Sequence, residues 1–130
     1  MSKINWIDRD LIVGPYIALV QSKKQFHAAM NHCQIPKADH GNWIKTPTAN
    51  ATMHWLDNPA GEQCCIVAVR EKKGVTPVEV CGLLVHEAVH IWQAFRERIG
   101  EDNPSKEFEA YAIQAISQRL MHAYKHKGVK

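Results

Sequence analysis

The sequence lacks any long apolar run, and it lacks the cysteine pairs that mark zinc ribbons. No stretch of the 130 residues approaches the roughly 20 consecutive apolar residues of a membrane-spanning helix. The four cysteines form no Cys-x-x-Cys pair, which excludes a zinc ribbon and argues against a disulfide framework. We therefore expect a cytoplasmic protein that does not contact membranes and keeps its cysteines reduced in the core. These cysteines are Cys33, Cys64, Cys65 and Cys81.

Charge of one sign, repeats and linker-like segments are also scarce. The net charge of +3 is too small to argue for nucleic-acid binding, so no nucleic-acid partner is expected. Residues 1–10 carry no hydrophobic signal core, and export by that route is not expected. The hydrophobic content of 45% is ordinary for a globular protein, and together with the length it predicts a single domain over residues 1–130. This domain is expected to end in a basic tail at about 125–130.

One stretch carries recognisable chemistry, the run His86-Glu87-Ala88-Val89-His90. Side chains four residues apart on a helix point the same way, so both imidazoles can reach one cation. Such a pair suits Zn²⁺, which binds histidine nitrogens at about 2.0–2.1 Å. Glu87 lies about 100° around the helix from His86, off the metal but beside a metal-bound water. This pattern predicts a zinc hydrolase in which Glu87 is the general base.

Signals at both ends place this run on a helix. Thr76-Pro77-Val78-Glu79 is typical of a capping box with proline at the first helical position. Gly100 predicts the end of the helix, and Arg96 and Arg98 in the last turn suit its dipole.

The rest of the chain predicts an α+β fold. We expect an N-terminal helix over residues 15–31, a short strand over 43–45, and a hairpin of strands over 51–56 and 63–70. A C-terminal helix over 104–124 would follow the motif helix, with Asn103 as its cap. The small sheet is expected to be antiparallel. If the strand over 63–70 lay at its edge, it could bind an extended peptide by strand addition.

A catalytic zinc needs a third protein ligand, and the C-terminal helix offers Glu109. Glu109 falls on the inward apolar stripe of this helix, whereas Glu107 falls on the opposite, more polar side. A buried ion pair of Glu109 with a residue such as Arg96 is the alternative. The stripe consists of Phe108, Glu109, Ala112, Ile113, Ile116 and Leu120.

The motif followed by the Glu109-Ala110 step resembles the gluzincin metallopeptidases, and residues 50–124 resemble small metallopeptidase-like proteins of phages and prophages. The resemblance implies a zincin-like minimal core and zinc held by His86, His90 and Glu109. It also implies peptide-bond hydrolysis with Glu87 as base, in the cytoplasm of a bacterial host. The segment His90-Ile91-Trp92-Gln93 is also similar to SprT-like proteases, whose third ligand is a histidine. His122 would take that place here, with His126 as a further candidate.

Rival functions remain open beside a peptidase acting on protein or peptide. They are a non-enzymatic zinc-binding phage or regulatory module, and a hydrolase of another substrate such as a peptidoglycan peptide. An intact Glu87 favours the enzymes, because a structural metal site has no use for a base. Tyr111 and His54 are candidates to stabilise the transition-state oxygen, and Gln93 is a candidate hydrogen-bond partner of the zinc ligands.

Overall fold

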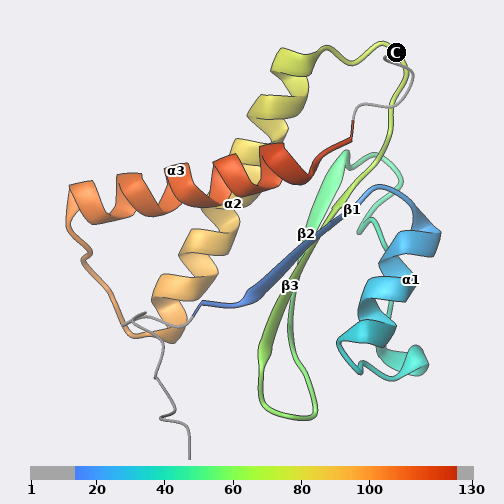
Figure 1. Ribbon diagram of the computed structural model, residues 1–130, viewed down its shortest axis with the longest axis horizontal. Helices are drawn as coiled ribbons and strands as arrows, with labels where there is room; N and C mark the ends of the chain where they lie inside the picture. Colours follow the sequence, from blue (N-terminus) through green and yellow to red (C-terminus); the bar gives the residue numbers. More distant parts are fainter. Residues whose placement is uncertain (1–13, 126–130) are drawn as a thin grey trace, which may run out of the picture.

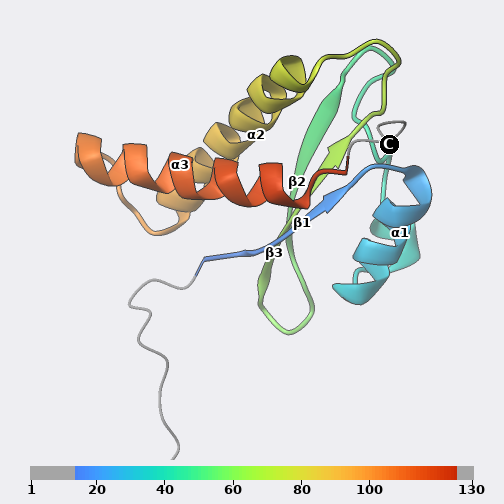
Figure 2. The ribbon, with the colours of Figure 1, turned by 45° about the horizontal axis from the view of Figure 1, so that its top comes forward.

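A three-stranded sheet separates two long helices from a shorter one in the computed structural model, which describes residues 14–125 (Figures 1 and 2). The expected α+β class is therefore confirmed, whereas the zincin-like details remain a prediction. In chain order the elements are β1 (Tyr16–Val20), α1 (Lys23–His32), a 3₁₀ turn (Lys37–Asp39), β2 (Ala51–Asp57), β3 (Gln63–Val69), α2 (Pro77–Arg98) and α3 (Lys106–Ala123).

The sheet is mixed, with strand order β1-β3-β2. β2 and β3 form the predicted antiparallel hairpin, but β1 pairs in parallel with β3, so the expectation of a wholly antiparallel sheet is wrong. β3 is the central strand, and both of its sides are already hydrogen-bonded to neighbours. Strand addition of a peptide onto the strand over 63–70 is therefore excluded, because only β1 and β2 lie at edges.

The helix predicted over residues 15–31 is wrong in its first half. Residues Tyr16–Val20 form β1 instead, because alternate side chains of a strand can pack on opposite faces of the sheet. Leu19 packs on the face covered by α2, and Val20 packs on the face covered by α1. Ser22 then begins α1, and its hydroxyl accepts a hydrogen bond from the Gln25 amide at 3.1 Å.

The short strand predicted over residues 43–45 is also wrong. This segment forms bends that attach to β2 through side chains rather than through a backbone ladder. The Trp43 carbonyl accepts a hydrogen bond from Nε2 of His54 at 2.8 Å, and the Lys45 amide donates to Oγ1 of Thr52 at 2.9 Å. The segment therefore covers the α1 face of the hairpin without adding a strand.

The core has one apolar layer on each face of the sheet. In β3, Cys65 and Val67 pack against α2 and α3, whereas Ile66 and Ala68 pack against α1. All four cysteines are free, as expected. Burial raises the pKa of Cys64 to about 11 and that of Cys65 to about 12, so both remain thiols at neutral pH.

Helix α2 begins at the predicted capping box. Oγ1 of Thr76 accepts from the Glu79 amide, and the Glu79 carboxylate accepts from the Thr76 amide, both at 3.2 Å. The helix ends at Arg98. Gly100, just after that end, has a φ of +73°, a backbone conformation that favours glycine.

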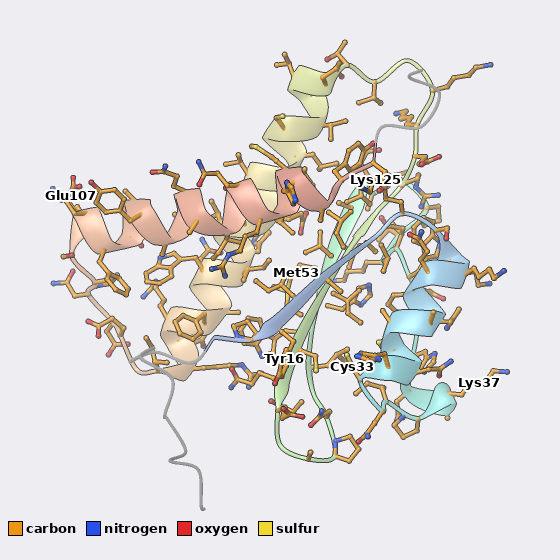
Figure 3. The ribbon with its side chains drawn as sticks, viewed as in Figure 1. Tyr16, Cys33, Lys37, Met53, Glu107 and Lys125 are labelled. Atoms are coloured by element: carbon orange, nitrogen blue, oxygen red, sulfur yellow. The ribbon has the colours of Figure 1, made fainter. Side chains whose placement is uncertain are left out.

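Helix α3 starts two residues later than predicted, because Ser105 and not Asn103 is its cap. The Ser105 hydroxyl accepts from the Phe108 amide at 3.1 Å. At the other end, the amide group of buried Gln21, which follows β1, bonds both the N–H and the carbonyl of Lys125, at 2.8 and 2.7 Å. Figure 3 shows Lys125 beside the end of β1, at the opposite end of α3 from Glu107.

No helix within residues 14–125 is long and apolar enough to cross a bilayer. The expectations that concern residues 1–10 and the basic tail fall largely on residues outside the described range.

The stability of the fold is expected to fall below neutral pH because of His54. Burial lowers the pKa of His54, and its hydrogen bond to the Trp43 carbonyl offsets part of that effect. The unfolded chain, with a histidine pKa of about 6.5, then binds a proton before the folded chain does, so stability decreases as the pH falls through that value. His54→Gln should flatten the dependence, measured as a smaller drop in the urea midpoint between about pH 7.5 and 5. An unchanged pH dependence in this variant would contradict the assignment.

Candidate functional site

The two motif histidines converge on one point at the surface of α2. Their Nε2 atoms lie 3.1 Å apart, and the ring centroids lie 4.7 Å apart at an interplanar angle of 79°. Two nitrogens that each bind one tetrahedral zinc at about 2.0–2.1 Å lie about 3.3–3.4 Å apart. The spacing of His86 and His90 therefore fits a single shared cation after a small adjustment. Because the pairing needs only a regular helix, it follows directly from the four-residue spacing.

A hydrogen bond from the opposite ring nitrogen orients His90. Its Nδ1 lies 3.2 Å from Oε1 of Gln93, one turn further along α2. If Nδ1 carries the proton, it donates a hydrogen bond to Oε1 of Gln93, and Nε2 is left unprotonated for a metal. Gln93 was predicted to act as a partner of this kind.

Glu87 differs from the two histidines in its burial. His86 and His90 are exposed, whereas Glu87 is only 5% exposed and lies at the edge of the buried face of α2. Burial raises the pKa of Glu87, and the neighbouring imidazoles oppose part of that rise. Burial is the main cause of the raised pKa of Cys65 on β3, and the charge of Glu87 raises it further. A carboxyl group with a raised pKa is better suited to take up and release a proton near neutrality.

A cleft of about 700 Å³ opens beside these residues. His86 and Glu87 form part of its α2 wall, and Tyr124 contributes from the end of α3. The segment before β2 and the loop after β3 form the remaining wall, and Figures 1 and 2 both show these two segments side by side. The site thus combines a nitrogen pair, a buried carboxyl group and a cleft large enough for part of a peptide.

Glu109, the predicted third ligand, contacts another group in the structure. Its Oε2 accepts a hydrogen bond of 2.8 Å from Nε1 of Trp92, whose side chain is 2% exposed. The alternative partner considered from the sequence, Arg96, donates instead to the Glu101 carbonyl at 3.1 Å. The Glu109 carboxylate therefore accepts the hydrogen bond of a buried indole N–H. Its assignment as a zinc ligand stays a prediction.

Within residues 14–125, no group of three or more His, Cys, Asp or Glu side chains is close enough to hold a metal ion. Glu107 lies in the first turn of α3, at the opposite end of that helix from Lys125 (Figure 3). The donor set thus fits two of the three protein ligands that a catalytic zinc requires. The third depends on a side chain that would have to change position.

The two residues suggested as oxyanion donors are not among the residues that line the cleft. Tyr111 is 66% exposed on α3, and His54 bonds the Trp43 carbonyl on the α1 side of the sheet. Tyr124 is the tyrosine that lines the cleft, and sequence reasoning missed it. The next residue, Lys125, is hydrogen-bonded to Gln21, a long-range contact that no local pattern indicates.

Comparisons with known proteins give this site no family. No protein family matches the sequence, and no curated protein or solved structure matches the chain. The resemblance to gluzincins therefore depends on the motif and the Glu109-Ala110 step alone.

Proposed function

We propose that the protein is a zinc-dependent metallopeptidase that hydrolyses a peptide bond in a protein or peptide substrate. The observation that supports this best is the convergence of the His86 and His90 Nε2 atoms, 3.1 Å apart, beside the buried carboxyl group of Glu87. A structural histidine pair would not need an adjacent, buried base at the margin of a cleft. We expect the enzyme to act in the cytoplasm of a bacterial host, as its resemblance to phage and prophage proteins implies.

Each residue of the site has one role in this proposal. His86 and His90 hold the zinc, and Gln93 keeps the His90 ring in the tautomer that leaves Nε2 for the metal. Zinc, when bound, would polarise the scissile carbonyl of the substrate and lower the pKa of a water molecule. Glu87 accepts a proton in the cleft and returns it to the leaving amine, which its raised pKa favours. Glu109 completes the ligand set once it leaves Trp92.

A histidine third ligand, as in SprT-like proteases, is the second candidate arrangement. Tyr124 brings the C-terminal end of α3 to the wall of the cleft, and His122 is exposed in the last turn of that helix. Glu109 is at the other end of α3. A third possibility, a non-enzymatic zinc-binding phage or regulatory module, is favoured by the exposure of the histidine pair.

Removal and return of metal tests the proposed function. We expect fresh wild-type protein to carry about one zinc per chain by native mass spectrometry. We also expect it to hydrolyse at least one substrate in a screen of unfolded proteins and cell-wall peptides. A chelator should abolish hydrolysis and lower the melting temperature, and zinc should restore both. Protein that binds zinc but cleaves nothing would support the regulatory module instead. Protein that binds no zinc would refute the metal site.

A further inference from the structure

A second cleft, of about 450 Å³, lies on the α1 side of the sheet. Its walls come from three separate segments: α1 with Lys23 and His27, the bends over residues 41–47 with Trp43 and Lys45, and Arg70 at the end of β3. We call it the basic cleft. The proposed catalytic residues lie outside it, so the peptidase mechanism leaves it without a role.

The basic cleft is lined by cations without compensating acids. The described residues that line it include Lys23, Lys45 and Arg70 but no aspartate or glutamate. Within residues 14–125 none of these three cations takes part in an ion pair. Burial first, and then the electrostatic influence of neighbouring groups that include Lys23, lowers the pKa of His27 in the same wall. Because the uncompensated charges surround a hollow, their potential concentrates there and attracts an anion.

Arg70 connects the basic cleft with the cleft of His86 and Glu87, because its side chain lines both. Its Nε donates to the Ala49 carbonyl at 3.1 Å and its Nη2 to the Thr46 carbonyl at 3.4 Å, which fixes the segment before β2. The guanidinium also lies 5.9 Å from the centre of the Trp43 ring. These bonds use two of the five N–H donors that a guanidinium carries, so donors remain for a ligand.

The same sign of charge continues into the catalytic cleft. Lys72 and Lys73, in the loop after β3, line it beyond Arg70. The acids in that lining are Glu87 and Glu79, and Glu79 is occupied by the cap of α2. An extended ligand that runs from one cleft to the other would therefore pass Arg70, with Lys23 and Lys45 on one side and Lys72 and Lys73 on the other.

We propose that the basic cleft binds acidic side chains of the polypeptide substrate, so that the enzyme selects peptides with aspartate or glutamate beside the cleaved segment. This inference rests on the proposed peptidase function and names its substrate class. Carboxylates suit the site because they accept hydrogen bonds from both ammonium and guanidinium groups. The binding is expected to weaken at high ionic strength, since the lysines are exposed.

A peptide fits these features better than a nucleic acid does. A nucleic-acid strand needs a long basic track to follow its closely spaced phosphates, whereas these cations surround one bounded hollow. Single-strand binders also present rows of aromatic rings for base stacking, and here Arg70 lies over the single tryptophan of the lining. The modest net charge of +3 agrees with local rather than general polyanion binding.

The test measures binding separately from hydrolysis. The full chain carrying Glu87→Gln is titrated into a fluorescent glutamate-containing peptide, and into the same peptide with glutamine at each glutamate, with anisotropy as the readout. We expect the glutamate peptide to bind more tightly, and Lys23→Glu with Lys45→Glu to weaken it about 2- to 30-fold, the range for two exposed ion pairs. Lys106→Glu, on α3 outside both clefts, is the matched control and should leave binding unchanged.

Three results of the binding measurement would overturn the proposal. They are equal affinity for the two peptides, an equal loss in the Lys106→Glu control, and tighter binding of a single-stranded oligonucleotide that the two lysine substitutions abolish. The last result would make the basic cleft a nucleic-acid site. Charge-dependent peptide binding in a protein whose wild type cleaves nothing would refute the peptidase function alone. Cleavage of neutral and acidic peptides with equal kcat/KM would refute the basic cleft alone.

Discussion

Glu87→Gln should lower hydrolysis about 10²- to 10⁴-fold while leaving zinc bound, since this is the usual contribution of a general base. The amide keeps the shape of the side chain but cannot accept the proton. The fold should persist, because the variant removes a carboxyl group that burial already disfavours in its charged form. The measurements are kcat/KM on a cleaved peptide, zinc content and melting temperature.

Glu79→Gln provides the matched control for this experiment. Glu79 lies on the same helix and lines the same cleft, but its carboxylate belongs to the capping box, a position that glutamine also fills. We expect this variant to retain hydrolysis. Full activity in Glu87→Gln, or an equal loss in Glu79→Gln, would show that Glu87 is not the base.

Zinc affinity should fall at least about 100-fold in His86→Ala and in His90→Ala, because loss of an outer hydrogen-bond partner alone costs up to that much. The same loss is expected for Glu109→Ala but not for Glu107→Ala, which changes an exposed residue at the outer end of α3. Competition titration with a chromogenic chelator measures each affinity. A greater loss in Glu107→Ala, or a loss only in His122→Ala, would refute Glu109 as the third ligand.

The hydrogen bond from Trp92 requires a further variant, because Glu109→Ala also leaves a buried indole without a partner. Such a group costs about 1–3 kcal/mol of stability whether or not zinc is present. Glu109→Gln keeps an acceptor for Nε1 of Trp92 and removes the carboxylate. If Glu109 binds zinc, this variant should fold normally without metal, lose zinc affinity, and lose any zinc-dependent change in Trp92 fluorescence. Normal zinc affinity in Glu109→Gln would leave Glu109 with the structural role alone.

Local patterns in the sequence determined helix α2 and the arrangement of the motif on it. The capping box needs only four consecutive residues, and the convergence of His86 and His90 needs only the regular rise and turn of a helix. The hairpin of β2 and β3 was equally predictable, because a short turn joins two strands that follow each other in the chain. In each case, residues close in the sequence supply the stabilising contacts.

The tertiary structure alone decided which distant segments meet. β1 became a strand because β3 offered it a parallel partner more than forty residues away, where the apolar pattern also allowed a helix. The inward face of α3 correctly predicted that Glu109 has a partner, but the crossing of α2 and α3 made that partner Trp92. Tyr124 lines the cleft beside His86 and Glu87, next to Lys125, which is hydrogen-bonded to Gln21 from the other end of the chain. Arg70 lines two clefts whose walls are built from distant segments. Such choices depend on the balance of packing and hydrogen bonding over the whole domain, which no single window of sequence contains.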